Sequence, residues 1–334
     1  MTPVSSLAFS VRGLTKRYGL VSAIENVSFT VASGSTAALV GPLGAGKTTV
    51  ARTLLGLLAP TSGTASVGGP GSKRAPGDAE RDVSSARVVG GVLAPRGLHP
   101  RRTARDHLRV YAAAVGVSDG RVEEVLDLVG LGEEAGSKGS ALSAGQQTRL
   151  ALATAVLGDP PLLVLDEPMN GLDAAERGWL QDFLRRHAKR GGSALVTSDS
   201  LAAVLPGADS VIVLSEGAVV YQGTPARLRR GHPDRLVVAA STPIALATTL
   251  AARGFTDAVI RPDGRLAVAE ATESDIRDAA TAAQVRLDSV IPDLIHPDRV
   301  LASLTKPQAP AAPPYPGLSG AVHHPTPTPY GIPR

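Results

Sequence analysis

The chain has 334 residues, with 34 Lys and Arg against 30 Asp and Glu, 43% hydrophobic residues and no cysteine. This length suits one domain of about 200 to 230 residues with an appendage. The absence of cysteine excludes disulfides, thiolate metal sites and a cysteine nucleophile. The net charge of +4 comes from interspersed acids and bases, which does not favour a nucleic-acid partner. No apolar stretch reaches the ~20 residues of a membrane span and no signal-peptide pattern is present, so we expect a chain that is neither secreted nor membrane-spanning.

Composition divides the chain into three parts. Residues 1–230 alternate β-branched apolar runs with helix-like segments, and Gly68–Gly77 within them is expected to be a surface loop. Residues 231–305 predict a small α+β domain, with a hairpin turn at Pro262-Asp263-Gly264. Its expected strands are Leu236–Ala240, Ala258–Arg261, Leu266–Ala269 and Val285–Val290, and its expected helices are Ile244–Arg253 and Glu273–Ala283. Residues 306–334 predict a disordered tail, since nine of the last 28 residues are proline.

A glycine-rich loop joins the apolar run Thr36–Val40 to an expected helix at Val50–Leu58. The loop reads Gly41, Pro42, Leu43, Gly44, Ala45, Gly46, Lys47, Thr48, Thr49. Glycines let backbone N–H groups surround a β-phosphate, and the helix start adds partial positive charge. Lys47 would reach the β- and γ-phosphate oxygens, and the Thr48 hydroxyl would ligate Mg²⁺. An ordinary glycine-rich turn before a helix does not account for all four fixed positions of this phosphate-binding pattern.

Two further motifs follow in a fixed order. Leu142-Ser143-Ala144-Gly145-Gln146-Gln147 precedes an expected helix at Thr148–Leu157, and by itself it also fits an ordinary helix N-cap. The apolar run Leu162–Leu165 ends in Asp166 and Glu167. Such a buried strand would bring Asp166 to Mg²⁺ through water, with Glu167 beside it to polarise an attacking water. The alternative is a core strand with an acidic end.

These motifs together resemble the ATP-binding subunit of ATP-binding cassette (ABC) transporters over residues 1–230. The resemblance implies an α/β P-loop NTPase cassette, with a RecA-like core and a helical subdomain, that binds ATP and Mg²⁺. It implies that Ser143, Gly145 and Gln146 contact an ATP held by a second subunit, and that Glu167 is catalytic. It also places Tyr18 on the adenine, although a core tyrosine is an alternative.

Another short segment matches the family pattern. Asn170-Gly171-Leu172-Asp173 resembles the loop that crosses the interface between two ATP-binding subunits. A turn in which Asp173 caps the next helix explains the same residues.

Two groups that the family pattern contains are missing from this sequence. A Gln, or in some members a Glu, is replaced at the corresponding position by Ala94, and no Gln or Asn occurs between Lys47 and Gln146. A His is replaced by Asp199, where a carboxylate about 4 Å from a phosphate charge would be repelled by on the order of 4 kcal/mol. In the alternative interpretation, Asp199 or Ser200 caps a helix at Leu201–Leu205. Smaller departures are Leu43, where Asn is usual, and Ala144, where Gly is usual.

The resemblance also implies the assembly. It predicts a homodimer or heterodimer with a second ATP-binding subunit, separately encoded transmembrane permease subunits, and a peripheral position on the inner face of the cell membrane. Within the family, the chain most resembles the single-cassette exporter subunits that carry a small C-terminal domain and act in drug or antibiotic efflux, so the resemblance implies an exporter. Arginines at 96, 101, 102, 105 and 109 would lie near lipid headgroups, although a solvated helix face is the alternative. Two other interpretations remain open: a catalytically weak partner in a heterodimeric pair, and an ABC-type ATPase without a transport role.

Overall fold

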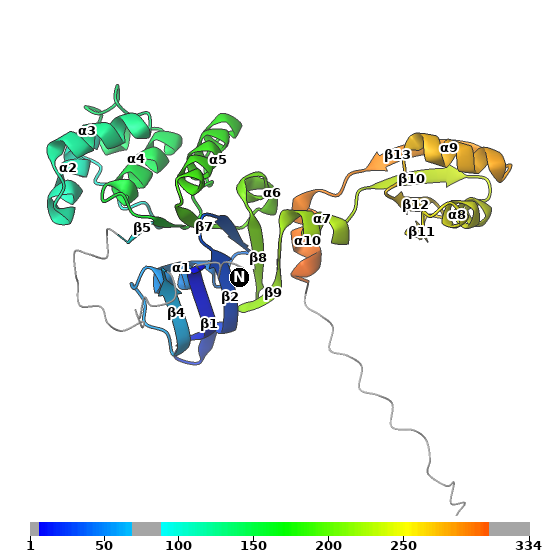
Figure 1. Ribbon diagram of the computed structural model, residues 1–334, viewed down its shortest axis with the longest axis horizontal. Helices are drawn as coiled ribbons and strands as arrows, with labels where there is room; N and C mark the ends of the chain where they lie inside the picture. Colours follow the sequence, from blue (N-terminus) through cyan, green and yellow to red (C-terminus); the bar gives the residue numbers. More distant parts are fainter. Residues whose placement is uncertain (1–6, 69–87, 307–334) are drawn as a thin grey trace, which may run out of the picture.

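The computed structural model describes residues 7–68 and 88–306. All but the first residue of the expected tail at 306–334 and nearly all of the expected loop at Gly68–Gly77 lie outside these ranges. In the described part, the chain forms a large α/β unit and a small α+β unit that lies apart from it (Figure 1). Two segments of the chain join the two units, one between α7 (Pro225–Gly231) and β10 (Arg235–Ala240) and one between β13 (Leu287–Asp293) and α10 (Pro297–Leu304).

A six-stranded sheet lies at the centre of the large unit, in the order β5-β6-β7-β3-β8-β9. Its strands are β3 (Thr36–Val40), β5 (Val89–Val92), β6 (Leu162–Leu165), β7 (Ser193–Ser198), β8 (Ser210–Ser215) and β9 (Ala218–Gly223). The first five are parallel, and β9 runs antiparallel to β8. Every residue of β3, β6 and β7 is buried, as expected for parallel strands covered on both faces.

One face of this sheet is covered by α1 (Lys47–Leu54) and a three-stranded antiparallel sheet. That second sheet consists of β1 (Leu7–Tyr18), β2 (Val21–Ala32) and β4 (Ser62–Val67). Phe9 of β1, Leu39 of β3 and Val50 of α1 belong to one buried cluster. The helix is therefore held between the two sheets, which fixes the position of the loop before it.

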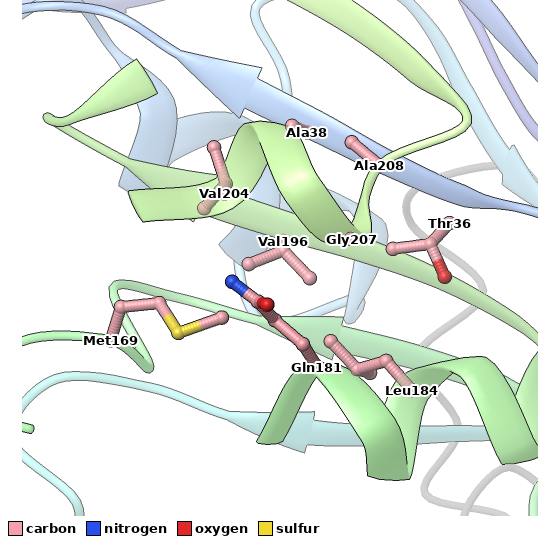
Figure 2. A pocket seen from close by; sticks show the side chains of 9 residues that line it. All are labelled: Thr36, Ala38, Met169, Gln181, Leu184, Val196, Val204, Gly207 and Ala208. Atoms are coloured by element: carbon pink, nitrogen blue, oxygen red, sulfur yellow. The ribbon is translucent and has the colours of Figure 1, made fainter. Parts of the chain in front are cut away.

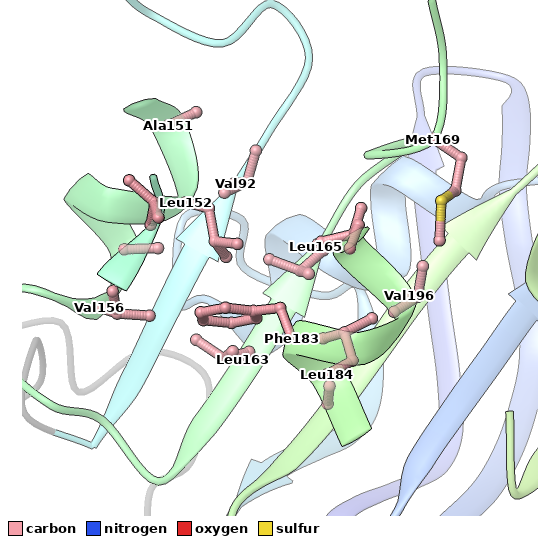
Figure 3. Close-up of a cluster of buried hydrophobic side chains, with 14 of the residues drawn as sticks. Val92, Ala151, Leu152, Val156, Leu163, Leu165, Met169, Phe183, Leu184 and Val196 are labelled. Atoms are coloured by element: carbon pink, nitrogen blue, oxygen red, sulfur yellow. The ribbon is translucent and has the colours of Figure 1, made fainter. Parts of the chain in front are cut away.

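The opposite face is covered by helices. Phe183 of α5 (Ala174–Lys189) packs against Leu163 and Leu165 of β6 (Figure 3). A helical lobe beside α5 consists of α2 (Ala104–Val115), α3 (Asp119–Leu128), the 3₁₀ turn η2 (Gly139–Ala141) and α4 (Ala144–Val156) (Figure 1). The implied core plus helical subdomain is confirmed by this arrangement.

The small unit has a four-stranded antiparallel sheet in the order β11-β12-β10-β13. Its elements are β10 (Arg235–Ala240), α8 (Pro243–Ala252), β11 (Ala258–Ile260), β12 (Leu266–Ala269), α9 (Glu273–Ala282) and β13 (Leu287–Asp293). This order is the interleaved βαββαβ pattern of ferredoxin-like domains. The expected elements occur in the expected order, with the last strand shifted from Val285–Val290 to Leu287–Asp293. Val238, Leu266 and Ile276 form its buried centre.

Three short helices lie where the two units join, and the chain passes from one unit to the other through α7 and α10. They are α6 (Leu201–Val204), followed by the 3₁₀ turn η3 (Leu205–Gly207), α7 (Pro225–Gly231) and α10 (Pro297–Leu304). Leu228 of α7 and Val300 and Leu301 of α10 are buried in the same cluster as α5 and α6. The chain thus leaves the large unit after α7 and returns to it at α10, so α10 contacts the large unit although composition groups it with the small one.

Two helices begin earlier than the sequence pattern predicts. α1 starts at Lys47 instead of Val50, because Gly46 takes a left-handed φ of 98° that closes the loop directly before the helix. α4 starts at Ala144 instead of Thr148, because the Ser143 side chain accepts a hydrogen bond from the Gln146 N–H and caps the helix at that point. Apolar periodicity alone does not detect these polar first turns.

Candidate nucleotide-binding site

The parallel sheet brings the sequence motifs to one edge. β6, β7 and β3 are neighbours, so their carboxyl ends meet where ligands of open α/β sheets bind. Asp166 follows β6, Ser198 ends β7 and Gly41 follows β3. The Gly41 N–H donates to the Ser198 carbonyl at 3.2 Å and joins the phosphate-binding loop to β7.

The loop needs glycine at defined positions. Gly44 and Gly46 have left-handed φ angles of 82° and 98°. A Cβ on Gly41 would lie 2.2 Å from the Leu214 carbonyl oxygen, and one on Gly46 would lie 2.3 Å from a methyl of Ile24. Close packing and backbone conformation therefore both explain the glycine pattern. The loop leads directly into the N-terminus of α1, and a glycine-rich loop before a helix N-terminus favours the binding of anions.

Lys47 is folded back into this loop. Its side chain is 6% exposed, and Nζ donates to the carbonyls of Gly41 at 2.8 Å and Pro42 at 3.2 Å. Nζ also lies 3.2 Å from Glu167 Oε1. The ammonium group is therefore at the centre of the site and is paired with the carboxylate that the sequence predicts to be catalytic.

Asp166 is held by two hydroxyl groups. Thr48 Oγ1 donates toward it at 2.9 Å to Oδ2 and 3.2 Å to Oδ1, and Thr197 Oγ1 donates to Oδ1 at 2.7 Å. Asp166 is 2% exposed and Thr197 is fully buried. The Thr48 hydroxyl and the Asp166 carboxylate are hard oxygen donors in contact, so these residues fit Mg²⁺ together with phosphate oxygens.

Sequence reasoning missed Thr197. Its hydroxyl donates to Asp166 and accepts from the Glu167 N–H at 2.9 Å, so one side chain of β7 orients both acids of β6. The available signal was a polar residue near the end of an otherwise apolar strand, because a buried hydroxyl requires a hydrogen-bond partner.

Glu167 has a left-handed backbone conformation and a partly buried carboxyl group. Its φ is +50°, in the left-handed region that a non-glycine residue adopts at a cost of about 1 to 3 kcal/mol. Burial raises the pKa of its carboxyl above the ordinary value of 4.5, with a smaller contribution from Asp199, whereas Lys47 lowers it. Oε2 accepts a hydrogen bond from the Asp199 N–H at 3.3 Å. A carboxylate tuned in this way suits a general base.

The residues of the second motif lie elsewhere. Ser143 and Gln146 form a reciprocal capping box at the start of α4, so the helix-cap interpretation of this motif is correct. Within the described ranges, neither side chain hydrogen-bonds to the phosphate-binding loop. A Cβ on Gly145 would lie 1.7 Å from the carboxylate of Glu176, so a larger residue here would displace the side chain that completes the cap of α5.

The structure also decides between several alternatives. Tyr18 is 50% exposed, so the alternative of a core tyrosine is wrong, and Lys16 Nζ lies 5.2 Å from the centre of its ring.

Two helix caps that the sequence offers as alternatives are present. Asp173 caps α5 in a capping box with Glu176. Ser200, rather than Asp199, caps α6 through the Ala203 N–H.

Most of the arginine cluster has partners within the chain. Arg105 forms a bidentate ion pair with Glu123, and Arg109 lies 3.2 Å from Asp119. Arg96 Nη2 donates to the Asn170 carbonyl at 3.0 Å. For Arg105 and Arg109 this agrees with the alternative of a solvated, charged helix face.

A groove of about 540 Å³ lies between α2, α4 and the segment that contains β5 and Ala94. Leu55, Val89, Pro95 and Tyr111 are among the residues that line it, together with Arg96 and His107. His107 is 3% exposed, its Nδ1 has no hydrogen-bond partner within the described ranges, and burial lowers its pKa. The groove is mostly apolar, and the largely buried His107 ring is one of the few polar side chains that line it.

Comparison of the sequence with known proteins identifies the family of the chain. The model of the ABC transporter family matches residues 24–170. The Nod factor export ATP-binding protein I of Bradyrhizobium diazoefficiens is 35% identical over 236 residues, which are 69% of this chain and 74% of that protein. The chain belongs to the ABC transporter family. The sulfate/thiosulfate import ATP-binding protein CysA 2 of Chromobacterium violaceum is 36% identical over 71% of this chain.

The cassette also matches solved structures. One described as an ATP-binding subunit of an ABC transporter has a TM-score of 0.59 and 28% identity, over 67% of this chain and 92% of its own. The chain spans about 65% of the length of the sulfate/thiosulfate import relative and 64% of the Fe(3+) import protein FbpC of Brucella abortus. Across residues 7–68 and 88–306, no helix combines the length and hydrophobicity of a membrane span.

The raised pKa of Glu167 predicts a pH-dependent effect of the change Glu167→Gln. The energetic advantage of the protonated form is fully present below the unfolded pKa and is lost as the pH rises through the folded pKa. Gln cannot ionise, so the change in melting temperature that Glu167→Gln causes should become more favourable to the variant from pH 4 to pH 7. Thermal melts at a series of pH values measure this, with the exposed Glu133→Gln as control. If the difference in melting temperature between variant and parent stayed constant, or became less favourable to the variant as the pH rose, the raised pKa of this carboxyl and its burial would be contradicted.

Proposed function

We propose that the chain binds MgATP and hydrolyses it as the ATP-binding subunit of an ABC transporter. The observation that carries this proposal is the joint placement of Lys47, Thr48, Asp166 and Glu167 at one edge of the parallel sheet. In this function Lys47 binds phosphate oxygens, Thr48 and Asp166 hold Mg²⁺, which neutralises phosphate charge, and Glu167 accepts a proton from the attacking water. Tyr18 offers an exposed aromatic face for the adenine.

The second part of the proposal is the assembly. The capped start of α4, with Ser143, Gly145 and Gln146, contacts the nucleotide of a second ATP-binding subunit rather than its own. The absence of hydrogen bonds between Ser143 or Gln146 and the loop within the described ranges supports this role. Membrane association would be peripheral, through permease subunits at the cytoplasmic face. Relatives include import and export proteins, and export is favoured because the chain covers 75% of a Nod factor export protein against 65% of a sulfate/thiosulfate import protein.

The groove beside Ala94 is the proposed contact with a permease subunit. Apolar walls accommodate the apolar face of a short helix, and Arg96 adds a positive charge to the lining. The groove includes Pro95, directly after the position where the family pattern has Gln, so an occupant of the groove would act on the loop at Ala94.

Lys47→Ala tests nucleotide binding. The change removes the ammonium group from the centre of the loop, so MgATP affinity should fall at least about tenfold, or roughly 1.4 kcal/mol. Isothermal titration calorimetry measures the affinity. Arg52→Ala, which removes an exposed cation from the same helix, is the matched control and should bind normally. Unchanged binding by Lys47→Ala would contradict the proposed function.

A finer proposal concerns which site turns over. This chain's own loop lies beside Ala94 and Asp199, where the family pattern has Gln and His, whereas its Ser143 motif completes the site of its partner. Within the described ranges the Asp199 carboxylate forms no hydrogen bond or ion pair, and an acceptor-only carboxylate does not replace the hydrogen-bond donor that His provides. A preorganised hydrogen-bond donor accelerates a reaction by about 10²–10³. The chain's own site should therefore hydrolyse ATP more slowly than the site of its partner.

Measurements of ATP turnover test whether the chain's own site is slower than the site of its partner. We expect feeble ATP hydrolysis by the isolated chain, and an increase on Asp199→His, which returns a donor. With a partner cassette, Ser143→Ala should lower turnover more than Glu167→Gln does. Brisk hydrolysis by the isolated chain that Glu167→Gln abolishes would overturn the proposal and indicate a conventional homodimer.

A further inference from the structure

The turn that contains Asp199 is held by a residue far away in the sequence. Asp298 of α10 accepts a hydrogen bond from the Ala202 N–H at 3.0 Å and from the Ser200 hydroxyl at 3.1 Å. Ser200 Oγ in turn accepts from the Ala203 N–H. The first turn of α6 is therefore capped by its own Ser200 and by a carboxylate from the C-terminal helix.

The other end of α6 is anchored from α5. Gln181 Nε2 donates to the Ala203 carbonyl at 3.1 Å. Figure 2 shows the Gln181 amide pointing toward the α6 and η3 segment, beside a small cavity of about 10 Å³ that Val204 and Gly207 also line. α6 is thus fixed between two helices that belong to different parts of the chain.

Both apolar and polar contacts hold α10 against α6. Val300 and Leu301 are buried beside Leu201, although a cavity of about 150 Å³ remains next to this packing. Asp298 supplies directional contacts at this place, and Ser215 Oγ donates to the Thr305 carbonyl at 3.3 Å at the far end of α10.

The same turn reaches the proposed catalytic carboxylate. Asp199 directly precedes Ser200, and its N–H donates to Glu167 Oε2 at 3.3 Å. On the other side, Ser198 is joined to the phosphate-binding loop through Gly41. A shift of Ser200 therefore moves a hydrogen-bond donor of Glu167.

We propose that Asp298 is a positioning residue for ATP hydrolysis, which orients Glu167 through Ser200 and the Asp199 backbone. This rests on the proposed ATPase function. Since α10 follows β13 after residues 294–296 only, the small domain is attached directly to the helix that carries this contact.

Asp298→Ala in the full chain tests the proposal. We expect kcat to fall about tenfold, the equivalent of one lost hydrogen bond, while MgATP affinity by calorimetry changes less than about twofold. Asp298→Asn keeps a carbonyl oxygen of the same shape for the Ala202 N–H and should restore most of the turnover. Arg299→Ala, an exposed neighbour on the same helix, is the control. Unchanged kcat, or equal losses in kcat and affinity, would overturn the proposal.

A second measurement does not depend on hydrolysis. Asp298→Ala is combined with Glu167→Ala, and the four proteins are compared by thermal melting. If Asp298 acts on Glu167, the drop in melting temperature caused by Asp298→Ala is smaller when Glu167 is absent. Equal drops in both backgrounds would mean that Asp298 only caps α6. If the parent chain hydrolyses no ATP either alone or with a partner cassette, the proposed function fails, and this cycle alone decides the role of Asp298.

Discussion

The hydrogen bonds of Asp166 are the interaction on which the site depends. Thr48 Oγ1 from the start of α1 and Thr197 Oγ1 from the end of β7 both donate to this carboxylate, which itself follows β6. Three elements that are distant in the sequence are thereby joined by one buried anion. Such an anion is stable only with its hydrogen bonds satisfied, so the same contacts that orient the oxygens proposed to bind Mg²⁺ also fix the phosphate-binding loop relative to the sheet.

Charge balance around this centre explains why hydrolysis should be sensitive to small changes. Lys47 and Glu167 are paired at 3.2 Å in a mostly buried setting, where the loss of one partner leaves an uncompensated charge. The carboxylate of Asp199 adds a further negative charge where the family pattern has an imidazole. The site therefore retains the groups that we propose to bind MgATP and lacks the Gln and the His of the family pattern, which is the basis of the slow turnover that we propose.

Much of the cassette could be predicted from the sequence, because its motifs combine residue chemistry with strand and helix context. The strand before Asp166 and the loop before α1 are identified by short apolar runs that end in glycine or acid. Contacts between distant segments could not be predicted: Thr197 and Asp298 carry no motif, and their roles depend on which strands and helices become neighbours. Ser143 shows the same limit, since its sequence fits a helix cap and a ligand contact equally, and the cap alone is visible in one chain.

The Mg²⁺ dependence of ATP binding tests the account most directly. The affinity for ATP is measured by calorimetry with Mg²⁺ and with a chelator, for the parent, for Asp166→Asn and for Thr197→Val. The account predicts that Mg²⁺ strengthens ATP binding by the parent, that Asp166→Asn loses at least about tenfold of this benefit, roughly 1.4 kcal/mol, and that Thr197→Val loses a smaller part, while binding in the chelator stays nearly unchanged. An equal Mg²⁺ benefit in the parent and in Asp166→Asn would contradict it.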